Sequence, residues 1–143
     1  MVAGPETADV SFFTLHGAGF TSFSFAVITK LIVNQKIAQG KTFRVVSFDM
    51  RGHGETRCHD PSEESDWSSE TLVSDALSIA EIMFAPKHVG TKRSPVVVVG
   101  HSMGGAIAVR VAASGRFPGG PPNGIVVIDV VEGTAMAALP SMR

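Results

Sequence analysis

The residues best suited to chemistry in this chain of 143 residues are at positions 100–104, where the sequence GHSMG matches G-x-S-x-G. An apolar run, residues 96–99, precedes the motif, and an alanine-rich segment, residues 103–114, follows it. A serine between a strand and a helix lies on a sharp, strained turn, which lifts its hydroxyl above the sheet at the positive end of the helix. So tight a turn requires small residues two positions before and after the serine. We therefore predict Ser102 as the nucleophile of an acyl transfer reaction.

An acyl-transfer nucleophile needs hydrogen-bond donors for the oxyanion that develops in the transition state. One donor would be the backbone N–H of Met103, which directly follows the serine. The other is expected from the loop after the first apolar run, where residues 16–19 read HGAG. Glycine on either side of Ala18 lets the backbone turn inward. We predict the N–H of Ala18 as the second donor.

A third loop, residues 49–54 with the sequence DMRGHG, follows another apolar run. Its main expected task is to shape a turn beside the site. Arg51 is in addition our candidate for contact with an anionic group of a substrate.

The acid and the base of a catalytic triad are harder to find in this sequence. With a nucleophile on such a turn, the usual chain order is serine, then aspartate or glutamate, then histidine. All five histidines, at positions 16, 53, 59, 88 and 101, precede Ser102, so none has the place of the general base. Asp129 could orient such a base, although an aspartate at the end of a strand is also common for structural reasons alone.

Four apolar runs, each followed by a turn signal, indicate the strands that position these loops. They are residues 10–15, 43–49, 96–99 and 125–131. Helices are expected between them: a buried helix over residues 20–34, a helix capped by Ser68 with Leu72, Ala76, Ile79 and Met83 on one face, and residues 103–114. Residues 56–67, 87–95 and 115–124 are expected to be loops. Alternating strands and helices predict an α/β fold with a parallel sheet flanked by helices.

Composition excludes several classes of protein. Twelve Lys and Arg against thirteen Asp and Glu give a net charge of −1, so no nucleic-acid or membrane partner is expected. The single cysteine, Cys58, suits a reducing compartment. No targeting or membrane-spanning segment is recognisable. We expect one soluble intracellular domain over residues 1–143, located in the cytoplasm or also in the nucleus.

Four segments read together, LHGAGF, DMRGHGET, GHSMGGAIAV and IDVVEGTAMAAL, resemble the protein phosphatase methylesterase family of α/β-hydrolases. The motif GHSMGG is shared by many hydrolases, whereas IDVVEGTAM is close to diagnostic. The resemblance implies an esterase that removes the methyl ester from the C-terminal leucine of the protein phosphatase 2A catalytic subunit, without a metal or an organic cofactor. By motif, Ser102 matches the nucleophile and Asp129 the triad acid. Ala18 is a mild departure, because the family reads closer to HGGG there.

Members of this family are roughly twice as long, with a lid, further strands and the catalytic histidine after the part that this chain matches. The resemblance therefore implies a truncated α/β-hydrolase domain, with the third to sixth strands in the order 4-3-5-6, two uncovered edges and residues 125–131 as an apolar edge. A fragment, a splice form or a faulty gene model would explain this. Without a base the chain alone is expected to be essentially inactive.

Two other functions remain open at this point. One is a generic serine esterase or lipase of the same fold. The other is a non-catalytic protein that keeps the surface by which the family docks on the phosphatase.

Overall fold

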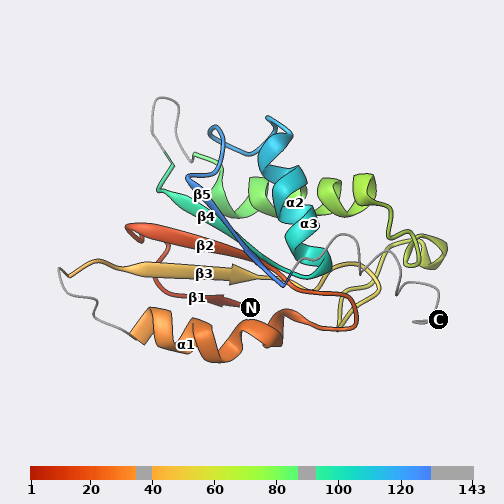
Figure 1. The fold of residues 1–143 in the computed structure, drawn as a ribbon, viewed down its shortest axis with the longest axis horizontal. Helices are drawn as coiled ribbons and strands as arrows, with labels where there is room; N and C mark the ends of the chain where they lie inside the picture. The colour runs from red at the N-terminus through yellow and green to blue at the C-terminus, as the bar shows by residue number, and fades with distance from the viewer. Residues whose placement is uncertain (35–39, 87–92, 130–143) are drawn as a thin grey trace.

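The computed structural model describes residues 1–34, 40–86 and 93–129 of the chain. These residues contain a sheet in the order β1-β3-β2-β4-β5 (Figure 1). Its strands are β1 (Val2–Ala3), β2 (Val10–Leu15), β3 (Phe43–Ser47), β4 (Val96–His101) and β5 (Gly124–Ile128). Most of the loop expected at 87–95 and the part of IDVVEGTAM beyond Asp129 lie outside the described residues.

The parallel sheet predicted from the four apolar runs is confirmed. β2 pairs in parallel with β3 and with β4, and β4 pairs in parallel with β5. This arrangement is the expected order 4-3-5-6. Because these four strands run in one direction, their carboxyl ends lie at the same edge of the sheet. The loops that carry the three sequence motifs all begin there.

One edge of the sheet is covered, contrary to the expectation of two bare edges. β1 pairs antiparallel with β3, placing Val2 opposite Val46 and Ala3 opposite Val45. The N-terminal amino group of Met1 donates a hydrogen bond to the Ser47 carbonyl, and the Ser47 N–H donates to the Met1 carbonyl. Two residues are too short a run to show alternation, so the sequence pattern did not reveal this strand.

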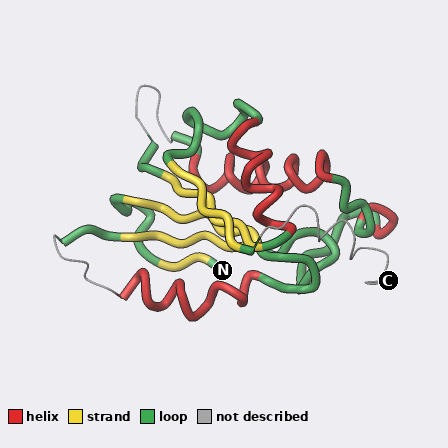
Figure 2. The backbone as a smooth tube through the Cα atoms, in the orientation of Figure 1, coloured by secondary structure: helices red, strands yellow, loops and turns green. Residues whose placement is uncertain are grey.

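Helices cover the two faces of the sheet unequally (Figure 2). On one face lie α2 (Ser69–Phe84) and α3 (Met103–Ala113), and on the other lies α1 (Ala26–Asn34). The predicted cap of α2 is confirmed, because the Ser68 side chain accepts a hydrogen bond from the Thr71 N–H. Short 3₁₀ helices at Ser22–Phe25 and Pro61–Glu63 complete the described elements. None of the helices in the described ranges is long and apolar enough to cross a bilayer.

The hydrophobic core lies between the sheet and the α2–α3 layer. Phe13 is at its centre, with its ring 5.7 Å from that of Phe48, 5.4 Å from Phe84 and 6.5 Å from Phe117. The α2 face predicted from sequence contributes Leu72 and Ala76, both buried, while Ile79 and Met83 pack at the margin. This core fixes the angle at which α3 leaves the sheet, and thus the position of the turn before it.

The prediction of a buried helix over residues 20–34 is wrong. That segment begins as the 3₁₀ helix Ser22–Phe25, and in α1 only Thr29 is buried. Val27 is 75% exposed and Leu31 is 52% exposed. In the described part of the chain this helix packs on β3 and on the preceding 3₁₀ helix, so only a narrow stripe of it is covered.

The predicted apolar edge is present at β5. Residues 125–128 are each between 42% and 44% exposed, so neither face of this strand is fully covered. The strand ends at Ile128, before the end of the expected run, and Asp129 lies beyond it. An edge with no charge, proline or bulge is a template for strand pairing.

Candidate active site

The sharp turn predicted at the GHSMG motif connects β4 to α3. Ser102 lies between His101, the last residue of β4, and Met103, the first of α3. Its backbone has φ 52° and ψ −120°, a region that residues with a side chain rarely occupy. The Ser102 N–H donates to the Ile128 carbonyl at 2.9 Å, which ties the turn to the end of β5. Ser102 itself is only partly buried.

Glycines on either side of the serine make this turn possible. A methyl group on Gly100 would overlap the backbone of Gly104 and Gly105. A methyl group on Gly104 would overlap the carbonyl oxygens of Leu15 and His16, where α3 crosses the end of β2. The requirement for small residues, inferred from spacing alone, thus has a direct steric cause.

We expect Ser102→Gly to be more stable than Ser102→Ala by about 1 kcal/mol. Strained backbone costs on the order of 1–3 kcal/mol, and glycine relieves it at an entropic cost of about 0.5–1 kcal/mol. Chemical denaturation monitored by circular dichroism measures the difference. The same pair at Ser114, where φ is −65°, is the control and should favour alanine. Equal stability of the two Ser102 variants would mean that the turn stores no strain.

The HGAG loop lies against the serine. A methyl group on Gly17 would come within 3.1 Å of Ser102 Cβ and 3.0 Å of His101 Nδ1. Met103 opens α3, so its N–H has no intrahelical acceptor. Ala18 is partly buried, and its N–H has no hydrogen-bond acceptor among the described residues. The structure therefore places the Met103 N–H at the start of α3, next to Ser102, and the Ala18 N–H in the loop that lies against Ser102. Their role as oxyanion donors stays a prediction.

His16 and His53 join the HGAG loop to the DMRGHG loop. The fully buried ring of His16 accepts a hydrogen bond from the Met50 N–H at Nε2 and donates to the Gly17 carbonyl from Nδ1. His53 accepts from the Gly19 N–H at Nε2, at 3.1 Å, and its Nδ1 lies 2.9 Å from the Arg51 carbonyl. Burial lowers the pKa of His16, which favours the neutral ring that this bonding requires.

Asp49 binds the residues that follow both loops. Its carboxylate accepts hydrogen bonds from the Ser22 N–H at 2.7 Å and from the Glu55 N–H at 3.2 Å. Burial raises the pKa of Asp49, but the hydrogen bonds from Ser22 and Glu55 outweigh this effect and bring the pKa below its ordinary value. Gly54 is required here, because a methyl group on it would overlap the carboxylate.

The Arg51 side chain is held in an ion pair with α2. Its guanidinium makes a two-pronged ion pair with Asp75 of α2, with N–O distances of 2.6 and 2.8 Å, and also donates to the Glu63 carbonyl. Asp75 strongly raises the pKa of Arg51. This agrees with the turn-shaping role expected for the loop. Contact of Arg51 with a substrate stays a prediction.

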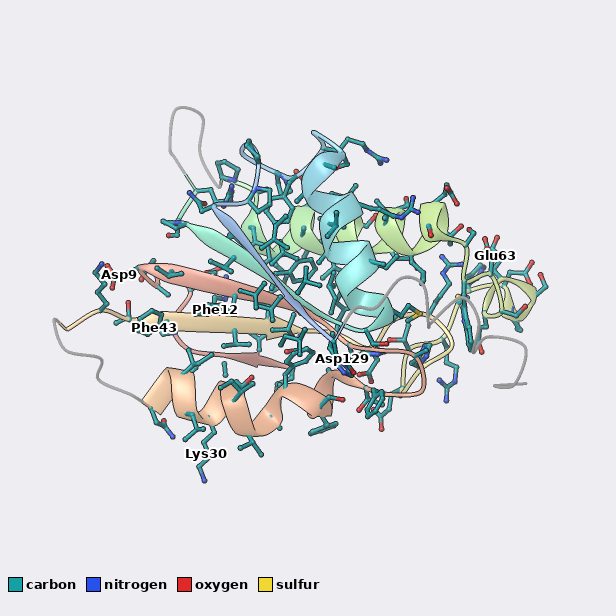
Figure 3. The ribbon with its side chains drawn as sticks, viewed as in Figure 1. Asp9, Phe12, Lys30, Phe43, Glu63 and Asp129 are labelled. Atoms are coloured by element: carbon teal, nitrogen blue, oxygen red, sulfur yellow. The ribbon has the colours of Figure 1, made fainter. Side chains whose placement is uncertain are left out.

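Asp129 lies at the carboxyl edge of the sheet, directly after β5 (Figure 3). Its side chain is 76% exposed, and its Oδ2 is 4.0 Å from His101 Nε2. The rings of His101 and Phe20 pack edge to face, with 5.5 Å between their centroids. Asp129 has φ 54°, so Ser102 and Asp129 are the non-glycine residues with positive φ in the described ranges. Backbone strain of this kind clusters at functional sites.

The described residues contain no group of three or more His, Cys, Asp or Glu side chains that could hold a metal ion.

Residues 12–143 match the family model described as the alpha/beta hydrolase family. The chain belongs to this family.

Curated relatives share about two fifths of the matched residues. The protein phosphatase methylesterase 1 of Mus musculus is 43% identical over 129 residues, and that of Homo sapiens 42%. A protein of Caenorhabditis elegans named as a probable protein phosphatase methylesterase 1 is 40% identical over 131 residues. The matches cover 90–92% of this chain but only 30–32% of the relatives, so the chain spans about a third of their length rather than the expected half.

Solved structures agree on the fold. A carboxylesterase from Nitrososphaera gargenis has a TM-score of 0.69 at 19% identity, covering 92% of this chain and 40% of that one. A lipase-esterase related protein from Clostridium acetobutylicum has a TM-score of 0.63 at 16% identity, covering 100% and 54%. At such identities the likeness extends to the fold alone.

Sequence reasoning missed several residues that hold the site together. It left His53 without a task, and it did not connect Arg51 to Asp75. The available signal was the pairing of an aspartate with a glycine five residues later in DMRGHG, which marks a turn folded over a carboxylate. The partners of Arg51 and His53 lie 24 and 34 residues away in sequence, where no local pattern can identify them.

Proposed function

We propose that this chain carries the nucleophile, the oxyanion donors and the acid of a serine carboxylic ester hydrolase. Its proposed substrate is the methyl ester on the C-terminal leucine of the protein phosphatase 2A catalytic subunit. The observation that carries the proposal is the turn at Ser102, a strained serine at a helix N-terminus beside a glycine-rich loop. The names of the relatives support the ester chemistry, and the motif IDVVEGTAM supports the substrate.

The proposed reaction has two steps. Ser102 Oγ attacks the ester carbonyl carbon while a histidine takes its proton, and the N–H groups of Ala18 and Met103 stabilise the negative oxygen. Methanol leaves with that proton, which gives an acyl-enzyme. Water then attacks the acyl group, releases the leucine carboxylate and restores the hydroxyl. Asp129 holds the histidine in the required tautomer.

By the family resemblance, the histidine of this mechanism lies in the part of the sequence that follows the motifs matched here. His16 and His53 are unsuited to the task, because both nitrogens of each ring lie within hydrogen-bonding distance of backbone groups. Removing a catalytic histidine typically lowers turnover by about 10⁶-fold, leaving about 10³–10⁴-fold over water. We therefore expect residues 1–143 alone to be nearly inactive.

The test supplies the missing base from solution. A fluorophosphonate probe is added to the 143-residue chain over a series of imidazole concentrations, and the labelled residue is identified by mass spectrometry. Labelling of Ser102 should be slow without imidazole and rise in proportion to it. Ser102→Ala should remain unlabelled, while Ser78→Ala, at an exposed serine of α2, should label as the wild type does. Labelling elsewhere, or none at any concentration, would exclude Ser102 as the nucleophile. Fast labelling without imidazole would instead contradict the missing base.

Substrate and partner need separate measurements. With imidazole present, release of methanol from a peptide ending in leucine methyl ester should exceed hydrolysis of short acyl esters; the reverse preference would favour a generic esterase.

Titration with the phosphatase catalytic subunit tests the docking alternative, and no binding at micromolar concentration would exclude that alternative. A cytoplasmic or nuclear location, where that phosphatase would be met, is part of the proposal.

A further inference from the structure

The peptide unit that contains the Ala18 N–H is held from its opposite side. The Gly17 carbonyl accepts hydrogen bonds from His16 Nδ1 at 2.8 Å and from the Phe20 N–H at 3.1 Å. In a trans peptide the carbonyl and the following N–H point in opposite directions. Fixing the Gly17 oxygen therefore fixes the direction of the Ala18 N–H.

The next peptide unit is held by His53. Its Nε2 accepts the Gly19 N–H, and that N–H belongs to the same planar unit as the Ala18 carbonyl. Gly19 has φ +74°, a conformation that glycine adopts without strain. With both flanking peptide planes fixed, φ and ψ of Ala18 have little freedom left.

The ring of His53 is itself fixed on several sides. Because Nε2 accepts, Nδ1 carries the proton and donates to the Arg51 carbonyl. The ring centroid lies 5.0 Å from that of Trp67 and 5.0 Å from that of His16, and the residue is 7% exposed. The Arg51 side chain is anchored to Asp75, so this support reaches back to α2.

We propose that His53 is a positioning residue, which aims the Ala18 N–H at the oxyanion site by holding the Gly19 N–H. The inference rests on the proposed function, since aiming the Ala18 N–H has a catalytic purpose only if Ser102 is the nucleophile. It gives the DMRGHG loop a task other than substrate contact. The groups that contact the His53 ring are the Gly19 N–H, the Arg51 carbonyl and the rings of His16 and Trp67.

Hydrogen exchange tests the geometry without requiring activity. In His53→Ala the Gly19 N–H loses its acceptor, so its exchange, followed by NMR, should accelerate at least tenfold while the amides of β4 stay protected. His53→Gln should restore protection, because its side-chain oxygen can accept in place of Nε2. His59→Ala, at an exposed histidine of the next loop, should change nothing. Unchanged exchange of Gly19 in His53→Ala would overturn the proposal.

Reaction with the fluorophosphonate probe tests the purpose. With imidazole present, His53→Ala should lower the maximal rate of Ser102 labelling by about 10- to 100-fold, less than the 10²–10³-fold loss of an oxyanion donor. The probe concentration for half-maximal rate should not change, and His53→Gln should recover most of the rate. An unchanged maximal rate in His53→Ala overturns the positioning role. If the wild type does not label, the proposed function fails instead, and exchange at Gly19 alone decides whether His53 holds this peptide.

Discussion

Gly104→Ala should destabilise the chain by about 3 kcal/mol or more and remove any reactivity of Ser102. In an ordinary helix the change from glycine to alanine is favourable by about 1 kcal/mol. Here the added methyl group would overlap the carbonyl oxygens of Leu15 and His16. Leu15 ends β2, and His16 follows it in a loop held by buried hydrogen bonds, so neither backbone carbonyl can move aside as a flexible side chain would. The first turn of α3 must then shift away from β2, and the Met103 N–H shifts with it.

Gly124→Ala is the matched control for this prediction. At Gly124, the first residue of β5, an added methyl group meets Val97 at an ordinary contact distance of 3.7 Å, so its stability should change by less than about 1 kcal/mol. Urea denaturation, followed by circular dichroism and by the fluorescence of Trp67, the single tryptophan, measures both variants. A Gly104→Ala chain as stable as Gly124→Ala would show that the elbow tolerates a larger residue.

His16→Leu should cost about 3 kcal/mol, because it removes two buried hydrogen bonds at once. The Met50 N–H loses its acceptor and the Gly17 carbonyl loses one of its donors. The Met50 N–H is left buried without a partner, which costs about 1–3 kcal/mol, and the bond lost at the Gly17 carbonyl, which keeps the one from the Phe20 N–H, adds about 0.5–1.5 kcal/mol. His16→Gln, which can keep one of the two bonds, should cost less. Denaturant titration measures both, and a His16→Leu chain as stable as the wild type would contradict the buried bonding.

The same residue should make stability depend on pH. Burial lowers the pKa of His16 in the folded chain below its ordinary value of 6.5, so between the two values the unfolded chain binds more protons. The free energy of unfolding should therefore be highest above pH 6.5 and fall as the pH drops from there toward the folded pKa, by at most about 1.4 kcal/mol per unit. His16→Gln should flatten this slope, and His59→Gln, at an exposed site, should not. An equal slope in His16→Gln and the wild type would exclude His16 as its source.

Carboxylates act at lower pH and can be separated from this effect. Hydrogen bonds lower the pKa of Asp9, Asp60 and Asp66 below the ordinary value of 3.8. Their contribution to stability is complete above that value and is lost as the pH falls through the lowered pKa values. The interval just below pH 6.5 therefore reports on histidine.

Several features followed from the sequence by itself. The spacing of GHSMG between an apolar run and an alanine-rich segment determined the turn at Ser102, and the four runs with intervening helices determined the parallel sheet. These predictions succeeded because each rests on residues adjacent in sequence: glycine permits a close approach, and apolar periodicity indicates a strand or a helix face. The sequence also indicated the last strand and Asp129 near its end, although the strand ends at Ile128 rather than at residue 131.

Only the tertiary structure decided how the loops hold one another. The bonds from His16 to Met50, from His53 to Gly19 and from Arg51 to Asp75 join segments 24 to 34 residues apart. Such polar pairs leave no periodic trace, because each consists of one side chain and one distant partner. The exposure of α1 and the pairing of β1 also depend on which surfaces meet in space rather than on local preference. Local sequence thus determined where the reactive serine lies, and long-range hydrogen bonds determined what holds the loop beside it.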